Sequence, residues 1–598
     1  MVAALDKVDH HLLMAALTGF VDHSVATPGP FLFMLEVGAS QDWAFVTQAL
    51  PNDGSRVTNA HVSTGSRFAT AQLTLNGLKK VLALPEVKWV EWGQPMAALR
   101  TVDRRGTQSV PSEPDQALPK SESPVLFGVV DHGCPFAHRA LRSANGTGTR
   151  ILSIWDQDPK PDFPSQLGAP DGFGFGRQAL RRHLNGYMKA SVSHGLVDED
   201  ACYRRAQYSP MRDALTHGSH TLGLLAGSWL KAGGKPANDL ATRSDVVFVQ
   251  LPRQVLQAPS HGGDHQCILD AVRYIVSCAG SATKDIVIVI DYGSYLGPHH
   301  GMSYIERALD ALVQEQLVQG KTLLLVFPSG NGAEDKTHAS GTVQAGSSAD
   351  MDWIVPSSAD APLWAEVWLP KNAAPATVHI TPPGASQPIG LKANSVCIDP
   401  AGSSFTALRL DRGRDEVILL RSGPTADGLA PAGQAGRYRV QITTGEHSLP
   451  VHFYTAWGGE NLGFPKRLGQ ARWLSHATGV QVGASGSILG TASGAYTFVA
   501  AGVSYDAAGC PDDRARYSGA GPSRAGKPPF VSAMCEDSPM RHGVLGLGTR
   551  SGAVARMWGT SVAAPIAARA LIQPGSVLKP LKKPGLTVNE VGQGAIEL

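Results

Sequence analysis

Several short segments of the sequence carry side chains whose types could perform acyl transfer. Asp131 directly follows the apolar run PVLFGVV, and His217 opens the Gly- and Ala-rich segment HGSHTLGLLAG. Asn331 lies in PSGNG after the apolar run TLLLVF, and Ser561 lies in GTSVAAP. A serine hydroxyl becomes a nucleophile when a histidine takes its proton and a carboxylate orients that histidine, and an amide can stabilise the resulting oxyanion. These residue types could therefore form a serine hydrolase site.

Each of these residues also has a structural interpretation. Ser561 precedes an Ala-rich helical segment, and serine is a favoured helix N-cap. Asp131 and Asn331 stand beside glycines, where Asp and Asn commonly form turns. His217 and His220 could instead bind zinc together with Asp131, although the usual helical zinc pair is spaced by four residues and includes a Glu.

The elements that must position these residues begin at Val125, where apolar strand-like runs start to alternate with helix-like stretches. The predicted strands are VLFGVV, DVVFVQL, DIVIVID and TLLLVF, and the predicted helices are HTLGLLAGSWL, CILDAVRYIVSCAG and SYIERALDALVQEQL. This alternation indicates an α/β domain, a mostly parallel sheet with helices on both faces. Loops at the carboxyl ends of such strands build the site, and Asp131 and Asn331 follow two of these ends.

The helical signal disappears between residues 350 and 464. LWAEVWLP, ATVHITPP, FTALRLD, EVILLRS, GRYRVQITT and VHFYTAW read as short strands separated by Pro, Gly and Asp turns. They predict an inserted β-sandwich or jelly roll. The insertion divides the catalytic domain into residues 124–349 and 465–575, and a C-terminal tail of residues 576–598 follows.

The chain before Val125 predicts a leader at residues 1–28, a small domain at 29–98 and a linker at 99–123. Within 31–92, FLFMLEV, QDWAFVTQAL, RFATAQL, NGLKKVLALP and VKWVEW alternate as strand and helix, and VTNAHVS would add a further strand. The result is a βαββαβ unit, an α+β, ferredoxin-like pattern. The linker is polar and rich in Pro and Ser, without a hydrophobic period.

Composition excludes several other classes of protein. The net charge is +2 and no long Lys/Arg cluster occurs, so neither nucleic acid nor an anionic membrane is an expected partner. The apolar runs are far shorter than a membrane span, and the first residues lack the basic start of a secretory signal. The 7 cysteines are scattered and odd in number, which favours unpaired thiols and a cytoplasmic location.

The segments VVDHG, HGSHTLGLLAG, PSGNG and GTSVAAP, in this chain order, resemble the Asp, His, Asn and Ser motifs of subtilases, the subtilisin-like serine peptidases. RYSGAGP at residues 516–522 also fits that family's pattern. The resemblance implies a subtilisin-like fold and a peptidase that cleaves internal peptide bonds of a protein or peptide substrate. Ser561 would be the nucleophile, His217 the base, Asp131 its orienting carboxylate, and Asn331 the oxyanion-hole donor.

The sequence departs from the family's usual pattern at a few positions. HGSH replaces HGTH, Val562 replaces a Met, and Asp291 stands where a Ser is typical. By the same resemblance, Asp291, Tyr292 and Gly293 would line the first specificity pocket. An acidic Asp291 there predicts a preference for a basic residue before the cut, unless its carboxylate faces solvent or is paired internally.

The flanking parts also resemble those of subtilases, in particular the Csp-type bacterial subgroup. Residues 31–92 look like the inhibitory propeptide, and the insertion containing WIVPSSADAPLWAEVWLP looks like that subgroup's jelly roll. The resemblance implies a zymogen whose own prodomain is an intramolecular inhibitor. No cofactor is required for the chemistry and no metal site is assigned, although structural Ca²⁺, common in subtilases, stays unmapped. The alternative is a subtilase-fold binding or scaffold protein whose prodomain permanently blocks the cleft.

Overall fold

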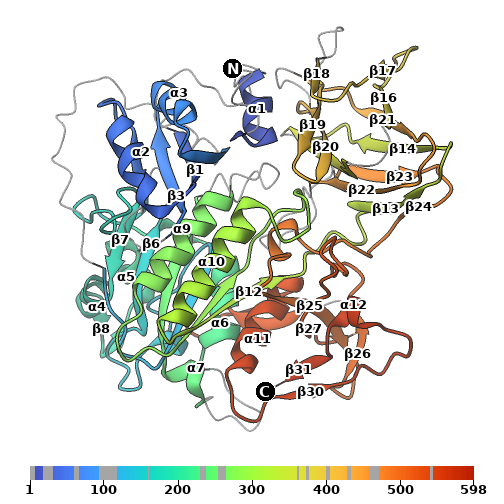
Figure 1. Ribbon diagram of the computed structural model, residues 1–598. Coiled ribbons are helices and arrows are strands. Elements are labelled where there is room, and N and C mark those ends of the chain that lie inside the picture. The colour runs from blue at the N-terminus through green and yellow to red at the C-terminus, as the bar shows by residue number, and fades with distance from the viewer. Residues whose placement is uncertain are drawn as a thin grey trace.

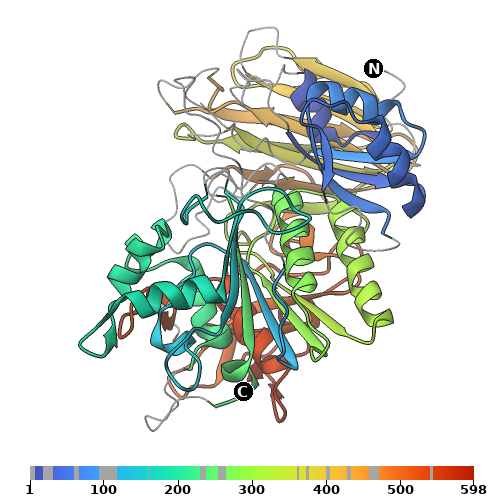
Figure 2. The ribbon, with the colours of Figure 1, turned by 90° about the vertical axis from the view of Figure 1, so that its left-hand side faces the viewer.

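The structure is a computed structural model, and three parts of the chain pack together in it: an N-terminal domain (residues 31–92), a central domain and an inserted sandwich (Figure 1). It describes residues 7–17, 31–58, 66–92, 118–158, 161–228, 238–252, 264–359, 362–371, 376–398, 404–426, 432–456, 470–538, 540 and 543–597. The N-terminal domain and the sandwich lie side by side at one end of the central domain, as Figures 1 and 2 both show.

The central domain is built on an 11-stranded sheet. In order across the sheet its strands are β30 (Val577–Lys579), β31 (Ala595–Glu597), β27 (Val531–Glu536), β25 (Thr497–Tyr505), β12 (Thr322–Pro328), β11 (Asp285–Ile290), β5 (Val125–Asp131), β10 (Asp245–Gln250), β6 (Ile151–Asp156) and β7 (Arg177–Leu180), and β26 (Pro511–Arg514) pairs with β25. The strands from β31 to β6 are parallel. Continuous Val- and Ile-rich runs form them because both faces of the sheet are covered. The predicted α/β architecture is confirmed.

Helices cover both faces of this sheet. α9 (Asp264–Ser277) and α10 (Tyr304–Val318) pack with the strands on one face, and α6 (His217–Ala226) and α11 (Thr560–Leu571) pack on the other. Shorter helices and hairpins complete the domain: α4 (Arg181–Ala190), α5 (Glu199–Arg205), α7 (Leu240–Arg243), α12 (Val588–Val591), β8 (Val192–Ser193) with β9 (Leu196–Val197), and β28 (Val544–Leu547) with β29 (Val554–Met557). In the described part of the chain, every helix is too short or too polar to span a bilayer.

The N-terminal domain has the βαββαβ order that the sequence predicted. Its elements are β1 (Phe31–Val37), α2 (Trp43–Ala49), β2 (Arg56–Thr58), β3 (Phe68–Leu73), α3 (Leu75–Ala83) and β4 (Val87–Trp92). The antiparallel sheet has the order β2-β3-β1-β4, which is that of a ferredoxin-like unit. Most of the predicted strand VTNAHVS lies outside the described residues, beyond Thr58.

The N-terminal domain docks on α10, through polar contacts of Tyr304 and Arg307, and on α9, where Arg273 donates to the Phe68 carbonyl oxygen. The Tyr304 hydroxyl donates to the carbonyl oxygens of Leu35 and Ala69, at 2.7 and 3.1 Å. The Arg307 guanidinium binds both carboxylate oxygens of Glu36 at 2.7 Å each. Bidentate Arg–carboxylate pairs combine strength with a fixed orientation. These contacts therefore fix the orientation of the N-terminal domain on the central domain.

Part of the predicted leader is an integral piece of the fold. α1 (His10–Leu17) follows Val8, which bridges to Val90 of β4. The His10 Nε2 atom lies 2.8 Å from the buried Glu366 carboxylate of the sandwich, and Leu13 packs in an apolar cluster with Trp368. α1 thus links the N-terminal domain to the sandwich.

The insertion is a two-sheet sandwich, but it is longer than predicted. One sheet has the order β18 (Ser395–Ile398), β19 (Thr406–Arg412), β20 (Asp415–Ser422), β15 (Leu363–Pro370), β22 (Leu449–Thr455), β13 (His338–Val343) and β24 (Val480–Val482). The other has the order β17 (Ile389–Gly390), β16 (Thr377–Thr381), β21 (Gly436–Thr443), β14 (Ser348–Val355) and β23 (Arg472–Ser475). The predicted bounds of 350–464 miss β13, β23 and β24, because these strands are short or polar and are recognised only by their pairing.

The predicted C-terminal tail, residues 576–598, is also part of the central domain. β30 and β31 extend the edge of the main sheet, where Ala595 pairs with Ser532 of β27. Of the predicted linker, the last residues are described, and Ser121 bridges to Ala279. Residues 99–117 lie outside the described residues. The domain boundary predicted at 575 is therefore wrong, since the sheet continues to residue 597.

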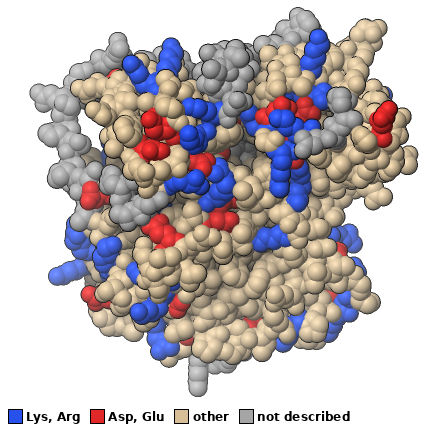
Figure 3. Space-filling view, in the orientation of Figure 1, with Lys and Arg blue, Asp and Glu red and all other residues tan. Residues whose placement is uncertain are grey.

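The state of the cysteines and the distribution of surface charge can be compared with what the composition predicted. All 7 cysteines are free, and 5 of them are buried. On the face seen in Figure 3, basic and acidic side chains are interspersed rather than sorted into separate regions. A mixed surface of this kind gives no single-sign field to steer a polyanion toward this face.

Candidate active site

Asp131 and His217 meet at the carboxyl end of the main sheet, as expected. Asp131 is the last residue of β5, and His217 is the first residue of α6, whose N-cap Thr216 accepts from the backbone N–H of Ser219. The His217 Nδ1 atom lies 2.8 Å from both carboxylate oxygens of Asp131, and both side chains are at least 96% buried. This contact fixes the imidazole so that Nε2 is its other reactive atom.

The surroundings of His217 favour its charged form. Burial alone would lower the pKa of His217, but the Asp131 carboxylate, through its charge and its hydrogen bond, and more weakly Asp291, raise that pKa to about 9. His220 behaves in the opposite way, since burial lowers its pKa to about 4. The surroundings of His217 therefore favour its charged form, whereas those of His220 favour its neutral form.

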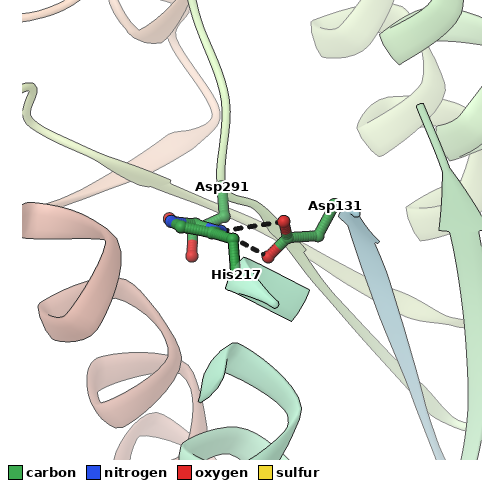
Figure 4. Close-up of side chains that lie close together, drawn as sticks. All are labelled: Asp131, His217 and Asp291. Atoms are coloured by element: carbon green, nitrogen blue, oxygen red, sulfur yellow. Dashed lines mark hydrogen bonds and ion pairs between the residues drawn. The ribbon is translucent and has the colours of Figure 1, made fainter. Parts of the chain in front are cut away.

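Asp291 stands directly after β11, the strand beside β5, and is drawn with Asp131 and His217 in Figure 4. One polar atom from each of these three residues lies within 4.8 Å of the others. The Thr221 hydroxyl donates to Asp291 Oδ2 at 2.9 Å, so the carboxylate is paired internally. Burial raises the pKa of Asp291, and the Asp131 charge raises it further, whereas His217, Thr221 and the nearby Ser561 hydroxyl lower it.

Asn331 lies at the carboxyl end of β12 and is held by its neighbours. The Tyr295 hydroxyl accepts the backbone N–H of Asn331 and, at 2.9 Å, that of Gly332. The side-chain oxygen of Asn331 accepts from the backbone N–H of Thr560 at 2.8 Å and from its hydroxyl at 3.0 Å. Because Oδ1 is engaged by Thr560, Nδ2 is the end of the amide that can donate to another group.

Ser561 is the second residue of α11. The helix begins at Thr560, and its N-cap is Gly559, so the expectation that Ser561 caps the helix is wrong. Gly559 has a φ of +123°, and a Cβ there would approach Asn331 Nδ2 to 3.1 Å, so this position suits glycine. Pro565 lies in the second turn rather than the first, where it provides no N–H for the Ser561 carbonyl.

The predicted residues therefore lie close together, although the hydrogen bond between Ser561 and His217 is not formed. Ser561 lies close enough to Asp291 to lower its pKa, and Asp291 lies beside His217. Within the described structure, the side-chain hydrogen bonds of His217 are with Asp131, and none joins it to Ser561. Catalytic hydrogen bonds are often long without substrate and tighten when it binds.

The predicted pocket residues are mostly buried. The Tyr292 side chain belongs to the apolar core beneath α9 and α10, and a Cβ on Gly293 would approach Thr491 Oγ1 to 2.5 Å. Any contact of these two residues with substrate would come from their backbone. The basic-residue preference stays a prediction, and the internal pairing of Asp291 with Thr221 argues against it.

The predicted zinc alternative loses one of its ligands. The His220 Nε2 atom hydrogen-bonds to the Val544 carbonyl oxygen at 2.9 Å. Among the described residues, the carboxylate and imidazole atoms close enough to share an ion belong to Asp131, His217 and Asp291.

Sequence reasoning missed Thr221, Tyr295 and Thr560, which orient the residues it identified. Thr221 follows His217 by four positions, so both lie on one face of α6. This spacing could have identified Thr221 as a neighbour of the site from the sequence alone. Tyr295 carries no comparable signal, because its contact with the segment after β12 depends on the tertiary fold.

Comparisons with known proteins bear on the fold. No protein-family model matches the sequence, and no curated protein matches it. Among solved structures, the CspB protease of Clostridium perfringens is similar, with a TM-score of 0.58 and 15% sequence identity, over 80% of this chain and 92% of that chain. This chain therefore shares the fold of that CspB protease, an α/β sheet with inserted β structure, as the resemblance to subtilases predicted.

Proposed function

We propose that this protein is a serine endopeptidase that hydrolyses peptide bonds through Asp131, His217 and Ser561. The observation that carries the proposal is the buried contact of 2.8 Å between His217 Nδ1 and both Asp131 oxygens, at the sheet edge where α11 presents Ser561. A carboxylate placed in this way holds the imidazole for work at Nε2. The protease fold of the similar solved structure supports the same activity.

The proposed reaction follows from these positions. His217 Nε2 takes the Ser561 proton as the hydroxyl oxygen attacks the scissile carbonyl carbon, and Asp131 stabilises the imidazolium that forms. His217 then returns the proton to the leaving amine, which leaves an acyl group on Ser561. A water molecule, deprotonated by His217, attacks this ester, and His217 passes that proton to the departing Ser561 oxygen, which releases the acid and the free serine.

The oxyanion of each tetrahedral intermediate would be stabilised by hydrogen-bond donors at the start of α11. Asn331 Nδ2 is one donor, because Thr560 engages the other end of that amide. The Ser561 backbone N–H is the second, since it lies in the first turn of a helix, where N–H groups lack helical partners. Loss of one such donor typically costs about 3–4 kcal/mol of barrier.

We also propose that the N-terminal domain regulates this activity as the prodomain of a zymogen. Its docking on α10 through Tyr304 and Arg307, and on α9 through Arg273, supports the proposal, because these helices flank the sheet that carries the site. Cleavage within residues 99–123 would then separate the prodomain from the enzyme. The alternative is a scaffold protein in which this domain stays docked and blocks the cleft, and the same buried contacts favour it.

One experiment separates these functions. The purified full chain is treated with a fluorophosphonate probe, with Ser561→Ala as the control, and cuts in residues 93–123 are mapped by mass spectrometry. A peptidase zymogen gives labelling that depends on Ser561, together with a cut that is absent from the Ser561→Ala protein. Intact protein without labelling supports the scaffold, whereas labelling that persists in Ser561→Ala overturns the proposed mechanism.

A further inference from the structure

A second carboxylate stands beside the histidine, and the triad does not account for it. Asp291 follows β11, and β11 pairs in parallel with β5, which ends in Asp131. Parallel neighbours end at the same edge of a sheet, so both carboxylates reach the same site. Asp291 is 96% buried, and one of its oxygens belongs to the atom cluster with Asp131 and His217 that spans less than 4.8 Å.

The helix that carries the base also fixes this carboxylate. Thr221 lies one turn beyond His217 on α6, and its hydroxyl donates to Asp291 Oδ2 at 2.9 Å. The other oxygen, Oδ1, is buried and has no hydrogen-bond partner of ordinary geometry among the described residues, although the Ser561 hydroxyl lies close enough to this carboxylate to lower its pKa. Burying a hydrogen-bond acceptor without a donor raises the free energy of the folded state, and a nearby cation reduces this penalty.

Among the described groups whose charge raises or lowers the pKa of His217, none is a cation. Asp131 from β5 and Asp291 from the end of β11 face it with carboxylates, and His220 on its own helix is neutral because burial lowers its pKa to about 4. An imidazolium at His217 would satisfy both carboxylates, whereas a neutral imidazole would leave them to repel each other. The pKa of His217, raised to about 9, agrees with this reasoning.

We infer that Asp291 is a positioning residue that holds His217 as an imidazolium in the free enzyme, so that Ser561 is activated only at alkaline pH. The inference rests on the proposed peptidase function. His217 becomes the base when it releases its Nε2 proton to solvent, and Asp291 opposes that release. Burial raises the pKa of Asp291 itself to about 7, so Asp291 suppresses activity chiefly between about pH 7 and pH 9, without contacting the scissile bond.

The test measures the rate at which a fluorophosphonate labels Ser561 in the full chain between about pH 5 and pH 11, a span that covers the titration of histidine. For the unaltered protein we expect a midpoint near pH 9. Asp291→Asn keeps the shape and removes the charge, and we expect its midpoint to fall by about 1 pH unit, because Asp131 still raises the pKa of His217. A purely structural role would lower the labelling rate at every pH and leave the midpoint in place.

A matched control is Asp270→Asn, since Asp270 is also buried and also accepts from a threonine hydroxyl, that of Thr70, at 2.8 Å. Its midpoint should equal that of the unaltered protein. If Asp291→Asn does not fold, as judged by circular dichroism, Asp291→Ser serves in its place.

The outcomes distinguish this inference from the proposed function. A folded Asp291 variant that labels at Ser561 with an unchanged midpoint overturns the inference and leaves the peptidase proposal standing. If Ser561 is not labelled in any variant at any pH, the peptidase proposal fails, and the inference fails with it.

Discussion

Replacing Glu36 by Gln removes the charge that Arg307 binds across the interface between the N-terminal domain and α10. Both hydrogen bonds of this pair measure 2.7 Å, and the Glu36 side chain is only 9% exposed. Hydrogen bonds to charged groups contribute about 1.5–3 kcal/mol. Arg307 is 28% exposed and keeps some water, so we expect a loss of about 2 kcal/mol in docking free energy.

A loss of this size changes how often the N-terminal domain leaves its site. Since about 1.4 kcal/mol is a factor of ten, the undocked population should rise roughly 30-fold. A domain of about 60 residues is only marginally stable alone, so undocking exposes its strands to exchange. Hydrogen exchange of the β3 amides (Phe68–Leu73), measured by mass spectrometry in a Ser561→Ala background, reports this population when reclosing is faster than exchange.

A change of less than threefold in the β3 exchange rates of Glu36→Gln would refute the reasoning. Arg67→Gln is the matched control, because Arg67 also faces Glu36 but lies 3.8 Å away and is 52% exposed. Exposed pairs of this kind contribute about 0–1 kcal/mol, so exchange in Arg67→Gln should stay close to that of the parent.

Further predictions concern the site and the fold. Asn331→Ala should lower kcat by about 10²–10³-fold by removing an oxyanion donor, and steady-state kinetics with an undiminished kcat would contradict this. Gly341→Ala should destabilise the sandwich by at least about 1–3 kcal/mol, because the new Cβ would lie 1.9 Å from a facing backbone oxygen. Gly445→Ala, with open space around it, is its control, and equal shifts in urea unfolding would disprove the argument. The pKa of His217 is raised in the folded state from 6.5 to about 9, so its charged pairing with Asp131 stabilises the protein fully below pH 6.5 and this contribution disappears as the pH rises through 9. The difference in free energy of unfolding between the protein and Asp131→Asn should shrink over that interval, and a constant difference would rule out the raised pKa.

The carboxyl ends of β5 and β12 were predictable from the sequence, because a run of apolar residues stops there and polar residues follow. The apolar runs before Asp131 and Asn331 correspond to β5 and β12, and each polar residue follows at the carboxyl end. His217 was predictable as a helix start, since Thr216 supplies a capping side chain. In the sandwich, LWAEVWLP coincides with β15, because one strand of strong β-formers carries its own signal.

Features that depend on pairing between distant segments were not predictable. β13 and β24 are polar or short, and their place in the sandwich follows only from the pairing of Ala339 with Val482. The role of Ser561 as a cap was inferred from residue type, but Gly559 takes that position because its φ is positive and Asn331 lies against it. The pairing of Asp291 with Thr221 requires α6 to lie over the end of β11, which no local pattern encodes.

The pairing of β13 with β24 joins the two ends of the insertion, and this affects how the chain assembles. β12 pairs with β25 at Leu325 and Thr497, so their contact closes a loop of roughly 170 residues, which is entropically unfavourable. Once the sandwich has folded, Ala339 and Val482 are neighbours, and the loop that remains to be closed shortens to roughly 30 residues. The cost of closing it falls by about 1.5 kcal/mol. A sandwich that folds first therefore holds the two ends of the insertion together. It brings β25 and the chain that follows, including Ser561, back to β12 and the first half of the main sheet.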